Sequence, residues 1–214
     1  MESRPDRRRP DAAGEVDANS MQPRLELLIT ERAIRARVAR LARRIEARYG
    51  AAPEPEGLRL VVVLKGAVMF AADLGRQLRL PVTFDFVAAA SYGAGTRSSG
   101  TVALAGLERL EIAGRPVLVI EDILDSGRTA AAIIERLRPQ GPASLAVCAL
   151  LRKPAAAALP LPVSAIGFDI ADEFVVGYGM DWGERYRNLR DIHRLVLDRG
   201  AVARQDGDRW PTDG

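Results

Sequence analysis

The amino-acid sequence predicts an α/β fold, in which a mostly parallel, twisted sheet is flanked by helices. Four apolar segments, 58–64, 82–90, 116–121 and 143–151, have the length and the β-branched content of strands. Continuous apolar runs of this kind are typical of strands buried on both faces of a parallel sheet. Helical patterns follow the first and the third of them, and strands that alternate with helices form parallel sheets. The chain of 214 residues is long enough for one such domain.

The chain opens with residues 1–22, in which Pro, Asp, Arg, Ala and Ser occur without any period, and we expect a disordered arm there. Thr30 can cap a helix whose apolar residues recur at steps of four and three until Gly50. The segment PEPEG then links this helix to the first strand, and KGAVMFAADLGRQL after that strand predicts a turn and a helix. We expect one domain over 23–200, followed by a flexible tail over 201–214.

The segments after the later strands indicate a ligand site. SYGAGTRSSGT, residues 91–101, is rich in Gly, Ser and Thr, which predicts a mobile loop after the second strand. An acidic turn follows the third strand, and a helix begins near Gly127 or Arg128. Because ligands of such sheets bind beyond the carboxyl ends of the strands, we expect the loops after the four strands to meet at one crevice. Residues 163–189 should add short strands and loops beside it, and IHRLVL, which contains His193, should form an edge strand.

The composition excludes several classes of protein. The 31 basic residues face 28 acidic ones, and a net charge of +3 is too small to favour nucleic-acid binding. The chain contains neither an apolar run of about 18 residues nor the apolar core of a secretory signal, so we expect no membrane span and a cytoplasmic protein. The single cysteine, Cys148, lies in the apolar run LAVCALL and should be a buried core residue. Only two basic residues are lysines, Lys65 and Lys153, which favours a need for a compact ammonium at both positions.

The most specific segment is VLVIEDILDSGRT, residues 117–129. An apolar strand leads to the adjacent carboxylates of Glu121 and Asp122, and the segment then turns into a helix. Backbone N–H groups at that helix start, with the hydroxyls of Ser126 and Thr129, form a nest that suits a monophosphate. Adjacent carboxylates raise each other's pKa, so the acidic pair suits a bound diol or a hydrated Mg²⁺.

A structural interpretation of the same segment is an acidic turn in which Asp125 is the N-cap of the helix. The strand, the acidic pair, the Asp-Ser-Gly sequence and Thr129 together favour the binding interpretation.

This segment resembles the phosphoribosyl pyrophosphate signature of type I phosphoribosyltransferases, and the chain from about 25 to 195 is similar to bacterial hypoxanthine-guanine phosphoribosyltransferases. Four further segments match in order. VVLKGAVMFAADL resembles the pyrophosphate-binding loop, SYGAGTRSSG the mobile catalytic loop, LLRKP the purine-reading lysine segment, and DEFVVGYGMDWGERYRNL the base-binding carboxyl-terminal hood. The resemblance implies the type I phosphoribosyltransferase fold with a small carboxyl-terminal hood. It also implies Mg²⁺-dependent transfer of 5-phosphoribosyl to hypoxanthine or guanine, which gives IMP or GMP and pyrophosphate.

The resemblance also implies how phosphoribosyl pyrophosphate is held. Its 5-phosphate would be bound by Asp125, Ser126, Gly127, Arg128 and Thr129, and its ribose hydroxyls by Glu121 and Asp122. Its pyrophosphate would be bound by the backbone N–H groups of Lys65 and Gly66 and by the guanidinium of Arg187. The metal ligands would be Glu121, Asp122 and Asp181. Ser91 and Tyr92, at the base of the mobile loop, would close over the pyrophosphate and exclude water. The sequence does not show whether the peptide in the region of Lys65 and Gly66 is cis.

A 6-oxopurine presents O6 and N7 as acceptors on one edge, so a lysine donor fits O6. The resemblance assigns this role to Lys153 and makes Asp125 the general base or acid at N7. Phe174 would stack on the purine, although core packing is the alternative for a phenylalanine between apolar residues. Backbone groups of Val175 and Asp181 would read the remaining edge. The resemblance further implies a homo-oligomer, either a dimer or a tetramer.

Three features depart from the family pattern: Trp182 replaces a tyrosine, Arg152 precedes the lysine where an acid is common, and VALAGLERLEIAG lacks the usual lysine and acids. The first two leave the preference among hypoxanthine, guanine and xanthine open. Two other functions also remain open: a transferase for xanthine or a pyrimidine, and a phosphoribosyl pyrophosphate sensor within a transcription regulator. A complete catalytic set, Asp125, Lys153 and Lys65, favours an enzyme, and no DNA-reading module is recognisable.

Overall fold

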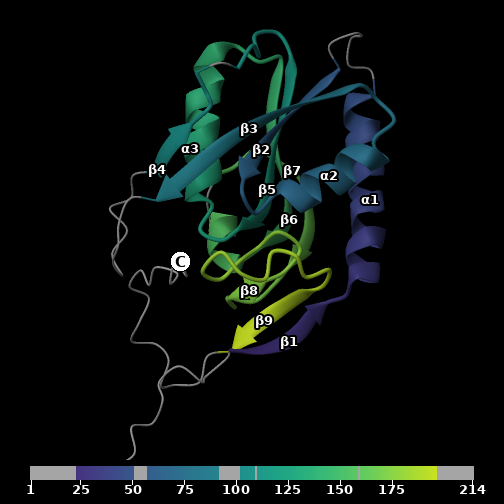
Figure 1. The fold of residues 1–214 in the computed structure, drawn as a ribbon. Coiled ribbons are helices and arrows are strands. Elements are labelled where there is room, and N and C mark those ends of the chain that lie inside the picture. Colours follow the sequence, from purple (N-terminus) through teal and green to yellow (C-terminus); the bar gives the residue numbers. More distant parts are fainter. Residues whose placement is uncertain (1–22, 51–56, 92–101, 109, 159, 197–214) are drawn as a thin grey trace, which may run out of the picture.

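The computed structural model describes residues 23–50, 57–91, 102–108, 110–158 and 160–196. Within these ranges, six strands form one sheet in the order β4-β3-β2-β5-β6-β7 (Figure 1). The strands are β2 Leu58–Leu64, β3 Val82–Ser91, β4 Val102–Ala105, β5 Pro116–Leu124, β6 Ser144–Arg152 and β7 Val163–Asp169. Neighbouring strands run parallel, except that β4 pairs with β3 in the antiparallel direction at one edge. The predicted α/β class with a mostly parallel sheet is confirmed.

Helices cover both faces of this sheet: α1 Glu31–Tyr49 and α2 Val68–Gln77 lie on one face and α3 Arg128–Leu137 lies on the other (Figure 1). Two short 3₁₀ segments, Arg138–Gln140 and Pro154–Ala158, complete the helical elements of the described residues. Successive side chains of a strand point to opposite faces. Leu60 therefore packs with the residues of α1 and α2, whereas Val61 packs with those of α3.

The predicted first helix forms as its pattern requires. The side chain of Thr30 accepts a hydrogen bond from the backbone N–H of Ala33 (3.2 Å), and Gly50 is the C-cap. The apolar residues at steps of four and three, Ile34, Val38, Leu41 and Ile45, are all buried. No helix of the described residues has the length and apolar character needed to cross a membrane.

A second, smaller sheet lies beyond the carboxyl ends of the central strands (Figure 1). Its antiparallel strands are β1 Arg24–Ile29, β9 Ile192–Val196 and β8 Val175–Val176, in the order β1-β9-β8. The prediction of an edge strand at IHRLVL is wrong, because β9 pairs with β1 on one side and with β8 on the other. The hood therefore contains an amino-terminal strand, although the sequence predicted a purely carboxyl-terminal hood.

Other predicted boundaries are also corrected. β5 continues to Leu124, because Ile123 and Leu124 still pair with β6, so the acidic pair lies inside the strand and not in a turn after it. Ser91 is the last residue of β3 and pairs with Val102, whereas the sequence placed it in the mobile loop. β1 and β4 were not predicted, and β7 belongs to the central sheet. The predicted arm at 1–22, the tail at 201–214 and Tyr92 lie outside the described residues.

Candidate active site

A crevice with a volume of about 330 Å³ opens at the carboxyl ends of β2, β5 and β6, as the sequence predicted. Its walls come from the loop after β2, the end of β5, the start of α3, the residue after β6 and the hood. Eleven of the residues proposed for the site line it: Lys65, Gly66, Glu121, Asp122, Asp125, Thr129, Lys153, Phe174, Val175, Asp181 and Arg187. Ser126, Gly127 and Arg128 do not line it. Segments far apart in the sequence thus contribute polar side chains to one crevice.

The acidic pair is the most strongly perturbed feature of this crevice. Burial, and then the charge of Asp122, raises the pKa of Glu121 well above its usual range. Burial also raises the pKa of Asp122 from 3.8 to about 6, although backbone hydrogen bonds and Arg187 act against this increase. Oε1 of Glu121 is buried without a hydrogen-bond partner in the part of the chain that the structure describes. A pair of adjacent, buried carboxyls with one unsatisfied oxygen fits a cation or a diol.

We expect Asp122→Asn to raise the free energy of unfolding of the free protein at pH 7.5. A carboxyl group with a raised pKa in the folded state stabilises the fold below its unfolded pKa, and this stabilisation is lost as the pH rises through the folded value. For Asp122 the window runs from about pH 4 to about pH 6, and the cost at pH 7.5 is up to about 3 kcal/mol. Urea unfolding at pH 5 and 7.5 measures it, with Asp169→Asn as the exposed control. An equal effect of Asp122→Asn at both pH values would contradict the assignment.

The segment after β5 forms a tight turn into α3. Gly127 is the N-cap of the helix, with a φ of 75° that favours glycine, and no side chain caps the helix. The alternative in which Asp125 is the N-cap is therefore wrong. Oγ of Ser126 lies 3.5 Å from the backbone N of Arg128 and accepts its hydrogen bond. At the start of an α-helix the first backbone N–H groups have no partner within the helix and can bind an anion.

Lys153 joins this turn to the hood. Its Nζ donates to Oδ2 of Asp125 (3.0 Å) and forms an ion pair with Oδ1 of Asp172 (3.2 Å). Although burial alone would lower it, the pKa of Lys153 is raised, because hydrogen bonds to both carboxylates favour the ammonium. The Lys153 side chain is 9% exposed and that of Asp125 is 63% exposed. A buried cation therefore lies within hydrogen-bond reach of an accessible carboxylate.

The loop after β2 approaches the acidic pair closely. A Cβ atom on Gly66 would lie 1.9 Å from Oδ2 of Asp122, so only glycine allows this approach. The peptide bond between Leu64 and Lys65 is cis. Nζ of Lys65 lies 2.8 Å from Oε2 of Glu184 in the hood.

Arg187 lies at the centre of the hood's polar contacts. Its Nη1 donates to the carbonyl of Gly179 (2.8 Å), and its Nη2 pairs with Asp181 (2.8 Å) and Glu184 (3.0 Å). Its Nε is buried without a hydrogen-bond partner among the described residues. The guanidinium is therefore fixed beside the carboxylates of Asp122 and Asp181.

Phe174 and Val175, two hood residues predicted to bind the base, differ in their exposure. Phe174 is 48% exposed and lines the crevice, so the alternative in which it is a core residue is wrong. Val175 is buried in β8, and its backbone pairs with Arg194 of β9. The carbonyl of Phe174 accepts a hydrogen bond from the backbone N–H of Leu195 (2.9 Å). The phenyl ring is thus an exposed apolar surface on a fixed backbone.

Cys148 is free and fully buried, as predicted for a core residue. Burial raises the pKa of its thiol to about 12, so the group is neutral at physiological pH.

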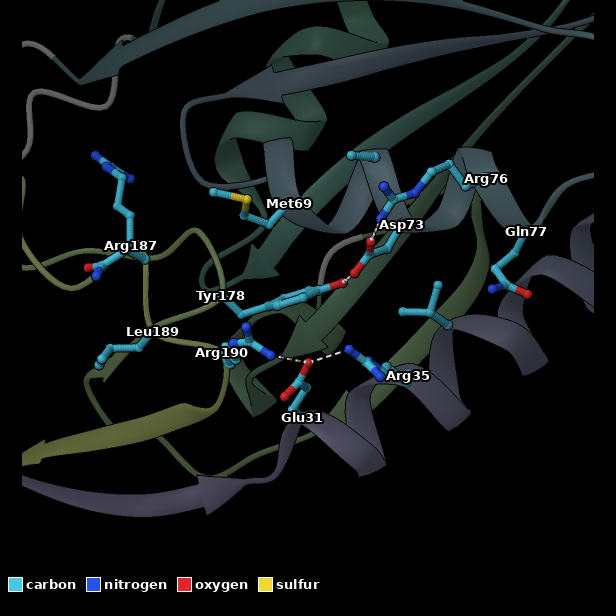
Figure 2. A pocket seen from close by; sticks show the side chains of 13 residues that line it. Glu31, Arg35, Met69, Asp73, Arg76, Gln77, Tyr178, Arg187, Leu189 and Arg190 are labelled. Carbon is cyan, nitrogen blue, oxygen red and sulfur yellow. Dashed lines mark hydrogen bonds and ion pairs between the residues drawn. The ribbon is translucent and has the colours of Figure 1, made fainter.

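Figure 2 shows a larger cavity of about 690 Å³ between α1, α2 and the hood. Several polar groups that line it are paired with one another. Asp73 accepts a hydrogen bond from Tyr178 (2.7 Å) and binds Arg76, and Glu31 binds Arg35. Arg187 lines both cavities, and its side chain extends away from Tyr178. We regard the smaller crevice as the candidate active site, because it contains two adjacent carboxyls with raised pKa values.

Sequence reasoning missed three polar residues of this region: Glu173, which lines the crevice, Asp172, which binds Lys153, and Glu184, which binds two cations. Their signal in the sequence is only that acidic residues stand in the hood segment. No group of three or more His, Cys, Asp or Glu side chains arranged to hold a metal occurs among the described residues. A cation at Glu121 and Asp122 would therefore need further oxygens from a substrate or water.

A family model, curated relatives and a solved structure that are similar to this chain are all phosphoribosyltransferases. The family model described as phosphoribosyl transferase domain matches residues 24–182. The hypoxanthine-guanine phosphoribosyltransferase of Mycobacterium avium is 47% identical over 172 residues, which are 79% of this chain and 84% of the relative. The hypoxanthine phosphoribosyltransferase of Salmonella typhimurium is 42% identical over 179 residues, or 83% and 98% of the two chains. A crystal structure of a hypoxanthine-guanine phosphoribosyltransferase from Bacillus anthracis superposes with a TM-score of 0.72 at 40% identity and covers 80% of this chain and 98% of that one.

Proposed function

The chain belongs to the phosphoribosyl transferase domain family, and from that premise we propose that it transfers 5-phosphoribosyl from phosphoribosyl pyrophosphate to hypoxanthine or guanine in purine salvage. The products are IMP or GMP and pyrophosphate. The observation that carries the proposal is that one crevice brings together the adjacent carboxylates, Thr129 of the predicted phosphate segment and the Lys153–Asp125 pair. A cytoplasmic location and assembly into a dimer or tetramer remain predictions.

The substrate would lie across the crevice in three parts. The 5-phosphate binds the nest at the start of α3, where Asp125, Ser126, Gly127, Arg128 and Thr129 surround it. The ribose hydroxyls bind Glu121 and Asp122, whose carboxylates accept their hydrogen bonds. The pyrophosphate meets the backbone N–H groups of Lys65 and Gly66 and the side chain of Arg187, since a forked guanidinium suits paired phosphate oxygens. Ser91 ends β3, at the position where the family resemblance places the residues that cover the pyrophosphate.

Magnesium fits the acidic pair, because Oε1 of Glu121 is buried without a partner and the pKa values of both carboxyls are raised. Glu121 and Asp122 would hold it together with oxygens of the substrate or of water, whereas Asp181 does not form a three-carboxylate metal site with them in the part of the chain that the structure describes. When bound, it would supply charge neutralisation for the departing pyrophosphate.

In the reaction, N9 of the purine forms a bond to C1 of the ribose while the bond from C1 to the pyrophosphate oxygen breaks. Lys153 donates to O6, and Asp125 accepts or donates the proton at N7 as the base changes from a free purine to a nucleotide. Phe174 stacks on the ring. The negative charge that develops on the leaving group would be received by the backbone N–H groups of Lys65 and Gly66 and by Arg187.

A spectrophotometric assay tests the proposal. Purified protein is given phosphoribosyl pyrophosphate and Mg²⁺ with hypoxanthine, guanine, xanthine, adenine or uracil in separate reactions. We expect nucleotide formation from hypoxanthine or guanine, and the relative rates would rank the 6-oxopurines. Binding of phosphoribosyl pyrophosphate without turnover of any base would instead indicate a sensor.

A further inference from the structure

One carboxylate, that of Glu184, connects Arg187 with the side-chain ammonium of Lys65, which belongs to the loop assigned to the pyrophosphate. Its Oε2 accepts a hydrogen bond from Nζ of Lys65 (2.8 Å), and its Oε1 accepts one from Nη2 of Arg187 (3.0 Å). Lys65 comes from the loop after β2 and Arg187 from the hood. Each oxygen of the carboxylate therefore meets a different cation, as two oxygens of a pyrophosphate would.

The backbone of Glu184 is fixed while its side chain is accessible. The residue has a φ of 63°, and its N–H donates to Oδ2 of Asp181 (2.9 Å). The turn is closed by two backbone hydrogen bonds of 3.2 Å between Trp182 and Arg185. The side chains of Glu184 and Lys65 are 63% and 66% exposed. The carboxylate can therefore rotate away from the two cations without any change in the turn.

We propose that Glu184 is a place-holding carboxylate, which occupies the cationic site in the free protein and is displaced by the pyrophosphate of the substrate. This inference rests on the proposed function, because it takes Arg187 and the loop of Lys65 as the place where the pyrophosphate binds. Without Glu184, the positive charges of Lys65 and Arg187 would repel each other with less negative charge nearby to offset the repulsion. With Glu184 present, the side chains of Lys65 and Arg187 stay close together. Each of them must then exchange a carboxylate oxygen for a phosphate oxygen when the substrate binds.

The energetics favour displacement. The carboxylate of Glu184, placed between two cations, carries the same sign of charge as the incoming ligand. Exposed ion pairs are weak, so the exchange costs little, but the cost is subtracted from the affinity for the pyrophosphate. Glu184 is thus a positioning residue that acts through Lys65 and Arg187.

The test compares Glu184→Gln with wild type and with Glu135→Gln, which removes one exposed negative charge from α3. Calorimetry with inorganic pyrophosphate and with phosphoribosyl pyrophosphate measures binding. Since two exposed ion pairs are broken on binding, we expect Glu184→Gln to lower both dissociation constants by about three- to tenfold. The KM for phosphoribosyl pyrophosphate falls likewise, while kcat is unchanged or lower because pyrophosphate leaves more slowly. Glu135→Gln changes none of these values.

A second variant, Glu184→Gly, removes the carboxylate and suits the positive φ, and it should shift binding in the same direction. Unchanged or weaker binding of pyrophosphate in Glu184→Gln overturns the proposal, as does an absence of pyrophosphate binding in all the proteins. The binding measurement needs no purine turnover, so it separates the two proposals. If no base reacts and the variant still binds pyrophosphate more tightly, the proposed function fails and the role of Glu184 stands.

Discussion

Replacement of Asp125 by alanine or asparagine is expected to lower kcat by about 10²–10⁴ while leaving the affinity for phosphoribosyl pyrophosphate largely unchanged. Asp125 is the accessible carboxylate of the crevice, and it is held by Lys153 at 3.0 Å. A group in this position can exchange a proton with N7 of a purine whose O6 is bound by the same lysine. Asparagine keeps the shape and accepts the lysine's hydrogen bond but cannot accept a proton. The loss should therefore appear in turnover and not in binding.

Asp172→Asn is the matched control for Asp125→Asn. Asp172 is the other carboxylate partner of Lys153, at 3.2 Å, and it has no assigned role in the reaction. If both variants lowered kcat equally, the effect would come from the position of Lys153, and a proton-transfer role for Asp125 would be rejected. Steady-state kinetics with hypoxanthine, together with calorimetry for phosphoribosyl pyrophosphate, distinguish the two results.

Lys153→Met should lower kcat/KM for hypoxanthine and guanine by about 100-fold, since a hydrogen bond to a charged donor contributes about 1.5–3 kcal/mol. Methionine has a similar length and suits the buried stem, but it leaves O6 without a donor. Lys153→Arg should be nearly as impaired, because a planar guanidinium does not replace a compact ammonium. The preference for 6-oxopurines over adenine should decrease in both variants. Retention of full activity and selectivity in Lys153→Met would remove this residue from base recognition.

Three further measurements test this assignment. Arg152→Met removes the neighbouring cation, which pairs with Asp169 at 2.7 Å outside the crevice lining, and should have a much smaller effect. Because the pKa of Lys153 is raised, the wild-type profile of kcat/KM should show no loss attributable to this lysine between pH 6 and about 9. Since Lys153 and Asp125 touch, the effects of their substitutions should not be additive.

The sequence by itself determined the elements whose signals are local. The capped helix after Thr30, the apolar strands and the turn at Gly127 follow from periodicity, capping residues and the freedom of glycine, and all three occur in the structure. The order of strands and helices also fixed which loops end at the carboxyl edge of the sheet. For this reason the predicted phosphate, ribose and lysine segments lie around one crevice.

Only the tertiary structure decided features that depend on a distant partner. β1 and β9 are separated by more than 160 residues, and neither the pairing of Leu25 with Leu195 nor the central place of β9 has a local signal. The extent of β5 was decided by its neighbour β6, which pairs with it beyond the acidic pair. The contact of Glu184 with Lys65 joins residues 119 positions apart. Periodicity and capping act within a few residues, whereas pairing, burial and the pKa values that follow from them depend on which segments the folded chain brings together.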